Sequence, residues 1–89
     1  MLEKQITIIN KLGLHARAAA KLINVTSSFS SDIKITKDGR TVDGKSIMSV
    51  MMLAASKGTE LIIATSGEDE QQAIDAIELL INNRFDEEE

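Results

Sequence analysis

The apolar residues of this chain recur with two different periods, and the alternation between those periods constrains the fold more than any other feature. From about Leu2 to Ile9 apolar and polar residues alternate, which is the period of a half-buried strand. From Ala16 to about Ser28 the apolar residues return at helical spacing, so this segment predicts an amphipathic helix. The chain therefore begins with a strand that leads into a helix.

The middle of the chain predicts a hairpin followed by a second helix. Residues 33–37 and 40–43 alternate between apolar and polar side chains, and the Asp38-Gly39 pair between them is a strong hairpin signal. Ser46 is a natural N-cap for a helix from Ile47 to about Ala54 or Ala55, because its hydroxyl can accept a hydrogen bond from a backbone N–H.

The last part of the chain predicts one more strand, over residues 60–65, and a third helix that begins at an Asp69 cap and ends at Asn83. The order is βαββαβα. Because 89 residues can supply only one layer of helices, we expect an α+β open-faced β-sandwich, in which three helices cover one face of a four-stranded, mainly antiparallel sheet. We expect residues 1–89 to form a single domain in which residues 86–89 are a frayed, acidic tail.

His15 is the only histidine of the chain, and it lies where a turn meets the alanine-rich first helix. The first N–H groups of a helix have no intrahelical partner and carry the positive end of its dipole, so they stabilise an anion and favour a neutral, nucleophilic imidazole. Gly13 lets the backbone turn, and Arg17 adds a permanent cation. These residues suit phosphohistidine chemistry, but each of them also has a structural or solvent-exposed alternative.

The second predicted helix is too apolar for every side to be buried in so small a domain. We expect Val50 and Leu53 to point into the core and Ile47, Met48 and Met51 to lie on the surface. Flexible, polarizable methionines suit a surface that fits several partners. The alternative is that the methionines fill an irregular core.

Composition excludes several classes of function. The chain has no cysteine and one histidine, so disulfides, thiolate catalysis and transition-metal sites are not expected. Its net charge is −4 and it has only two aromatic residues, which argues against nucleic acid as a partner. The N-terminal residues do not form a signal peptide and no apolar run could span a bilayer, so we expect a cytoplasmic protein without membrane insertion.

Two motifs, Gly13-Leu14-His15-Ala16-Arg17 and Gly44-Lys45-Ser46-Ile47-Met48, occur together with the βαββαβα order. In these features the chain resembles the HPr family, the histidine-containing phosphocarriers of the bacterial phosphoenolpyruvate-dependent phosphotransferase system. The resemblance covers residues 2 to 85. It is specific, because two separate motifs match at the family's spacing.

The resemblance implies a carrier that is not itself an enzyme, needs no cofactor and acts as a monomer. His15 would accept a phosphoryl group on Nδ1 from enzyme I and pass it to an enzyme IIA-type acceptor. The backbone N–H groups of Ala16 and Arg17 and the Arg17 guanidinium would hold the phosphate. Ser46 would be a regulatory site for an HPr kinase/phosphorylase. Partner proteins would dock on four residues, namely Ala20, Ile47, Met48 and Met51.

The chain departs from the family pattern at two places. Ala18 stands where the family commonly has proline, which costs about 0.5–1 kcal/mol of preorganisation at the start of the helix. The first helix has Lys21 but then Asn24 and Ser27, so the docking face is less basic than in many members. These departures keep open a second function, a regulatory interaction module such as a nitrogen-branch phosphocarrier or a co-regulator that acts through phosphorylated Ser46.

Overall fold

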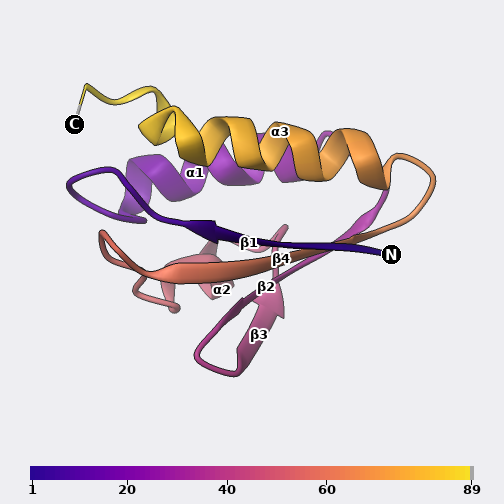
Figure 1. Ribbon diagram of the computed structural model, residues 1–89, viewed down its shortest axis with the longest axis horizontal. Helices are drawn as coiled ribbons and strands as arrows, with labels where there is room; N and C mark the ends of the chain where they lie inside the picture. Colours follow the sequence, from indigo (N-terminus) through magenta and orange to yellow (C-terminus); the bar gives the residue numbers. More distant parts are fainter. Residues whose placement is uncertain (89) are drawn as a thin grey trace.

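Four alternating segments form the strands of one sheet, and three segments with helical spacing form helices, in the order βαββαβα (Figure 1). The structure is a computed structural model that describes residues 1–88. The strands are β1 (Leu2–Thr7), β2 (Asp32–Lys37), β3 (Arg40–Asp43) and β4 (Glu60–Ser66). The helices are α1 (Ala16–Thr26), α2 (Ile47–Met51), α3 (Glu70–Asn82) and a short 3-10 helix, η1 (Arg84–Asp86).

The sheet has the strand order β1-β4-β2-β3, and all three strand pairs are antiparallel. Its register brings apolar residues of neighbouring strands together: Ile6 lies opposite Leu61, and Ile35 lies opposite Ile63. These four side chains are buried. Successive side chains of a strand point to opposite faces, so the other face carries the exposed neighbours, such as Gln5 and Ile62.

One layer of helices covers the buried face. The helices α1 and α3 lie side by side along the sheet, and α2 packs against α1 and β3 (Figure 1). Each long helix faces the sheet with a stripe of buried apolar side chains. In α1 this stripe includes the small Ala18 and Ala19, and in α3 it includes the larger Ile74 and Ile77. The predicted α+β open-faced sandwich is confirmed.

All three predicted helices end earlier than expected: α1 ends at Thr26 rather than Ser28, α2 at Met51 rather than at residue 54 or 55, and α3 at Asn82 rather than Asn83. The chain leaves α2 because Leu53 is drawn into the core and Ala54 takes a left-handed φ of 51°. This turn delivers the Ala55 carbonyl to the Leu14 N–H, which donates to it over 2.8 Å. A longer α2 could not make that contact.

Asp69 is the N-cap residue of α3, as predicted, but its side chain does not cap the helix. Its carboxylate makes no cap hydrogen bond to the helix. Instead it accepts hydrogen bonds from the Ser30 N–H (2.9 Å), the Ser31 N–H (3.0 Å) and the Ser31 hydroxyl. The hydroxyl of Ser31 contributes most to lowering the pKa of Asp69, to about 2, followed by the Ser30 N–H. Asp69 thus joins the start of α3 to the turn before β2.

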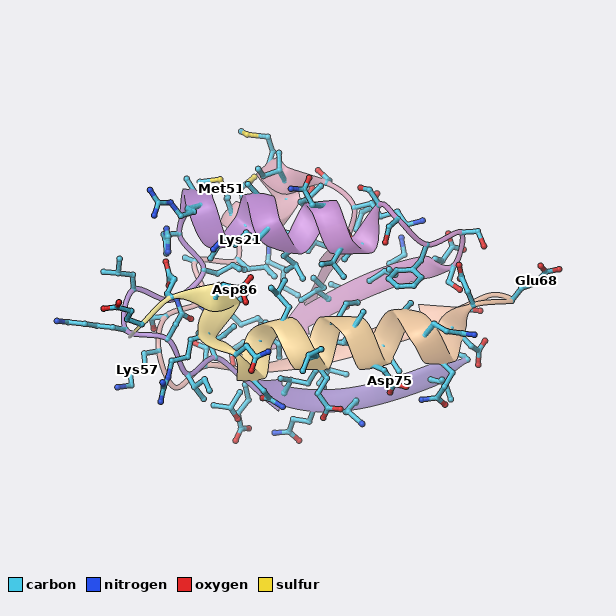
Figure 2. The ribbon with its side chains drawn as sticks, turned by 90° about the horizontal axis from the view of Figure 1, so that it is seen from above. Lys21, Met51, Lys57, Glu68, Asp75 and Asp86 are labelled. Atoms are coloured by element: carbon cyan, nitrogen blue, oxygen red, sulfur yellow. The ribbon has the colours of Figure 1, made fainter. Side chains whose placement is uncertain are left out.

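The acidic end of the chain was expected to fray from residue 86, and this is wrong for Asp86 and Glu87. Arg84, Phe85 and Asp86 form η1 with left-handed φ values of 56°, 53° and 62°, and Phe85 is completely buried. The Lys21 ammonium donates to the Phe85 carbonyl over 2.7 Å. Figure 2 shows Lys21 and Asp86 close to each other in the half of the molecule that lies away from Glu68. Glu89 lies outside the described residues.

We expect Asp69→Asn to destabilise the fold at pH 7 and to remove part of its acid sensitivity. Because the pKa of Asp69 is about 2 in the folded chain and about 4 in an unfolded one, its contribution is present above pH 4 and is lost as the pH falls toward 2. Urea denaturation at several pH values measures this difference. Asp32→Asn removes a nearby exposed carboxylate and should leave the change in the free energy of unfolding between pH 4 and pH 2 as it is in the wild type. If Asp69→Asn also showed the same change with pH as the wild type, the assignment would be contradicted.

Candidate functional site

His15 is the N-cap of α1. Its backbone is extended, with φ −78° and ψ 179°, and its carbonyl accepts the Ala19 N–H over 2.8 Å. Its imidazole makes no capping hydrogen bond to the helix, and its side chain is 27% exposed. The N–H groups of the first helical turn therefore lie beside a histidine ring that does not cap them.

The loop before His15 is held by close backbone packing. Gly13 has a φ of 68°, and a Cβ on it would lie 2.6 Å from the Ala55 carbonyl oxygen. The completely buried Asn10 side chain donates from Nδ2 to the Gly13 carbonyl over 2.7 Å. Only glycine satisfies both the left-handed conformation and the close approach, so the loop that presents His15 has a fixed backbone path.

Arg17 lies in the first turn of α1 and is exposed. Within residues 1–88 its guanidinium has no carboxylate partner. It lines a shallow hollow at the start of α1 together with the apolar Leu12 and with charged residues from three segments, namely Lys11, Lys21, Asp86, Glu87 and Glu88. A cation that is not engaged by the protein beside unpaired helix N–H groups can receive an anion such as phosphate.

Glu87 contacts the imidazole, and the sequence analysis missed it. Its Oε2 lies 2.5 Å from His15 Nε2, and its Oε1 accepts a hydrogen bond from Asn10 Nδ2 over 2.8 Å. The Asn10 hydrogen bond is the main cause that lowers the pKa of Glu87, and contacts with His15 and Lys21 act in the same direction. The one available signal was Phe85, an aromatic residue next to an otherwise polar tail.

The second motif lies on α2, where Ser46 is the N-cap and its hydroxyl accepts the Ser49 N–H over 3.3 Å. Val50 and Leu53 are buried, whereas Ile47 (39%), Met48 (68%) and Met51 (39%) are exposed, as predicted from the helical spacing. Ala20 is exposed on α1, the helix against which α2 packs. We call Ala20, Ile47, Met48 and Met51 the apolar patch. Met52, also exposed, extends the apolar surface of this segment.

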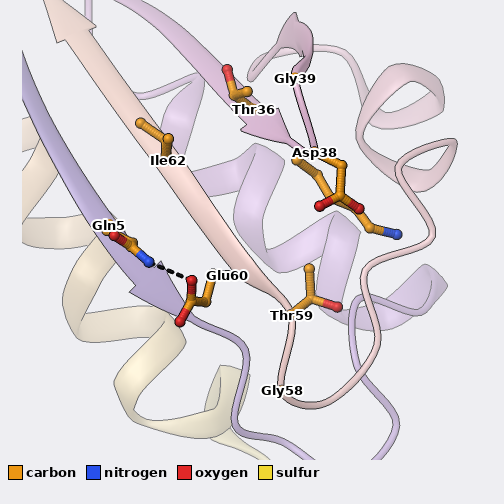
Figure 3. Close-up of a pocket in the computed structure, with 9 residues that line it drawn as sticks. Gln5, Thr36, Asp38, Gly39, Gly58, Thr59, Glu60 and Ile62 are labelled. Atoms are coloured by element: carbon orange, nitrogen blue, oxygen red, sulfur yellow. Dashed lines mark hydrogen bonds between the residues drawn. The ribbon is translucent and has the colours of Figure 1, made fainter.

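A second hollow lies on the open face of the sheet (Figure 3). Within it Gln5 donates to Glu60 over 2.5 Å, and the Lys37 ammonium is bound to the Leu53 carbonyl over 2.9 Å. None of the residues that line this hollow is a histidine, and its Gln5, Glu60 and Lys37 side chains are already hydrogen-bonded within the protein, so it is a weaker candidate than the surroundings of His15. In the part of the chain that the structure describes, no three His, Cys, Asp or Glu side chains come close enough to hold a metal ion.

The longest helix within residues 1–88, α3, has 13 residues. None of the helices in residues 1–88 has the length and apolar character needed to cross a bilayer.

An open-faced α+β fold that presents one histidine at a helix N-cap, beside a guanidinium and uncapped N–H groups, defines the class of small phosphoryl carriers. Comparison with known proteins agrees. The family model described as "PTS HPr component phosphorylation site" matches residues 2–83. The chain belongs to the HPr family, the phosphocarrier proteins of the phosphotransferase system.

Relatives and solved structures support this assignment. The chain is 56% identical to phosphocarrier protein HPr of Cupriavidus necator over 98% of both chains, and 57% identical to that of Pseudomonas aeruginosa over 93% of both. The crystal structure of HPr from Thermoanaerobacter tengcongensis matches all of both chains with a TM-score of 0.97 and 45% identity. An HPr dimer from the same organism matches with a TM-score of 0.79 and 45% identity, over 98% of this chain and all of that one.

We expect Gly13→Ala to lower the free energy of unfolding by about 1–3 kcal/mol more than Gly39→Ala does. Both glycines have a left-handed φ, but only a Cβ at residue 13 would meet backbone atoms, whereas a Cβ at residue 39 meets nothing within 4 Å. Urea denaturation of the two variants measures the difference. Equal losses would show that the close approach of Gly13 to Ala55 does not hold the loop.

Proposed function

We propose that the chain accepts a phosphoryl group on His15 Nδ1 from the phosphohistidine of enzyme I and passes it to an enzyme IIA-type acceptor. The observation that carries this proposal is that His15 is the N-cap residue of α1 while its side chain makes no hydrogen bond to the helix. The N–H groups of the first turn can therefore bind an anion beside the ring. The two partners, enzyme I and the enzyme IIA-type acceptor, are inferred from the carrier function of the family. The chain itself supplies a nucleophile and a place for the phosphate, and the transfer steps are catalysed together with the partner enzymes.

We propose that the Ala16 and Arg17 N–H groups and the Arg17 guanidinium hold the transferred phosphate. They lie in the first turn of the helix that begins after His15. A carrier has to release its phosphoryl group as readily as it accepts it, so the phosphate must not be stabilised too strongly. A side chain that is 27% exposed and an arginine on the surface meet that requirement, because solvent screens their interaction with the phosphate.

Ala18 in place of the usual proline is compatible with this function. It is completely buried against the core, and α1 forms with His15 as its N-cap. Burial of the Ala18 and Ala19 side chains holds the first turn of α1 in its helical conformation. Proline would have favoured the same conformation through its fixed φ.

We propose that the apolar patch is the surface on which partner proteins dock. Met48 is 68% exposed, and α2 packs against α1, the helix that His15 begins. Exposed apolar side chains on adjacent helices form a surface that a partner can cover while it reaches the histidine. We further propose that the carrier works as a monomer in which residues 1–89 form one domain, because pairing through the patch would block this surface.

We propose that phosphorylation of Ser46 by an HPr kinase/phosphorylase regulates docking. The Ser46 hydroxyl caps α2 and immediately precedes Ile47 and Met48 of the patch. A phosphate there suits the helix N-terminus, but it places about two negative charges beside the docking surface. This arrangement also supports the second candidate function, a regulatory module that acts by docking, since it does not depend on the chemistry of His15.

Incubation with phosphoenolpyruvate and enzyme I is expected to add one acid-labile phosphoryl group, seen by intact mass, to the wild type and none to His15→Ala. Arg17→Ala should still be phosphorylated but roughly tenfold or more slowly, because it loses a charge-assisted hydrogen bond to the phosphate. Thermal unfolding verifies that both variants fold. A wild-type chain that gains no mass, or a His15→Ala chain that does, would reject the assignment.

We expect Ser46→Asp to weaken binding of enzyme I by roughly tenfold, both in the wild type and in a His15→Ala background. Aspartate is a good N-cap, so α2 is retained while a negative charge appears beside the patch. Isothermal titration calorimetry measures the affinity. Ser66→Asp places the same charge on an exposed end of β4 and should have no effect; equal weakening by both variants would show that only net charge matters.

A further inference from the structure

The two oxygens of the Glu87 carboxylate contact two different residues, Asn10 in the loop before α1 and His15 at its end. One oxygen accepts from Asn10 Nδ2 over 2.8 Å, and the other lies 2.5 Å from His15 Nε2. Asn10 is completely buried, and the same Nδ2 donates to the Gly13 carbonyl over 2.7 Å. The carboxylate is therefore fixed relative to the backbone that places His15, so its contact with the ring has a defined geometry.

The chain reaches this position through a backbone conformation that costs free energy. Arg84, Phe85 and Asp86 all have left-handed φ values, which ordinary side chains rarely adopt. Burial of Phe85, the Lys21 hydrogen bond to its carbonyl and the Glu87 N–H bond to the Arg84 carbonyl (2.9 Å) hold the turn. Strained segments of this kind persist where the surroundings fix them, and they gather at functional sites. Here the turn returns Glu87 to the histidine.

The contact determines which ring nitrogen carries the hydrogen. Hydrogen bonding from Asn10 lowers the pKa of Glu87, so its carboxylate is ionised at neutral pH. An ionised carboxylate only accepts hydrogen bonds, so the hydrogen of the contact is on Nε2 of His15. A neutral imidazole has one such hydrogen, and the lone pair is then on Nδ1.

We infer that Glu87 is a positioning residue for the phosphoryl transfer: its carboxylate holds His15 in the Nε2–H tautomer and thereby leaves Nδ1 as the nucleophile. The inference rests on the proposed carrier function and adds to it the group that orients the ring. A histidine whose second nitrogen is bound by a carboxylate is the arrangement that fixes tautomer and direction in nucleophilic and metal sites.

The transfer balances without any other reactant. The Nδ1 lone pair attacks the phosphorus of the donor phosphohistidine, a new N–P bond forms, and the electron pair of the broken N–P bond returns to the donor ring. Nε2 keeps its hydrogen, so the His15 ring gains positive charge, which the Glu87 carboxylate neutralises. In the onward step the N–P electron pair returns to Nδ1, and the ring is again the neutral Nε2–H tautomer.

Other charges surround this pair from both sides. The hollow beside His15 is lined by Lys11 from the loop before α1 and by Arg17 and Lys21 from α1. Two carboxylates of the C-terminal segment, Asp86 and Glu88, line it as well. Lys21 also lowers the pKa of Glu87. Glu68 is exposed and carries the same charge as Glu87, but it lies at the other end of the molecule (Figure 2), so replacing it alters the net charge equally and provides the matched control.

The test is 15N NMR of the His15 ring in the unphosphorylated protein at about pH 8.5, about two units above the ordinary pKa of histidine. In the wild type and in Glu68→Ala we expect a hydrogen on Nε2, a bare Nδ1 and an Nε2–H proton protected from exchange with water. In Glu87→Ala the protected proton should disappear, and the two nitrogen shifts should move toward each other as the tautomers interconvert. Glu87→Asp keeps a carboxylate and should keep the Nε2–H tautomer in excess over Glu87→Ala.

The rate of phosphorylation by enzyme I is measured on the same four proteins. We expect Glu87→Ala to be about tenfold slower or more, and Glu68→Ala to match the wild type. Ring shifts in Glu87→Ala identical to those of the wild type, a hydrogen on Nδ1 in the wild type, or an unchanged rate in Glu87→Ala would each overturn the inference. A wild type that is not phosphorylated at all would instead reject the carrier function, and the NMR result would still report the contact.

Discussion

Burial of a single apolar sheet face beneath α1 and α3 is the constraint on which the other features depend. Leu61 and Ile63 of the central strand β4 are completely buried under these helices, which turn their own apolar stripes toward the sheet. The start of α1 lies at the edge of this core, where the His15 side chain is 27% exposed. The N-terminus of α1, with His15 as its cap, is therefore exposed to partners although the helix behind it is fixed by packing.

The same constraint explains the apolar patch. A five-residue helix such as α2 can bury only one side, and Val50 takes that side. Its remaining apolar residues stay in solvent, which is costly for a structural element and useful for a docking surface. A fixed histidine and an unfilled apolar surface thus arise from one packing arrangement, in which the core orders the backbone of the site and leaves its side chains accessible.

Local features of the fold and site were predictable because they depend on neighbours in sequence. The two periods of apolar residues gave the order of elements, and Asp38-Gly39 gave the hairpin that pairs β2 with β3. The cap at Ser46 and the burial of Val50 also depend on residues within one helical turn. Helix ends were less predictable, since α2 stops where Leu53 must enter the core.

The sequence by itself determined the elements, the position of His15 at a helix start and the exposed side of α2, because each follows from spacing along a few consecutive residues. The tertiary structure alone decided that Asp69 binds Ser30 and Ser31, that Phe85 is buried and that Glu87 reaches His15. Glu87 and His15 are 72 positions apart, and no local pattern encodes their contact. The carboxylates of an acidic tail can be solvated by water or can bind a histidine. Glu87 binds His15 because the burial of Phe85 fixes the backbone just before it.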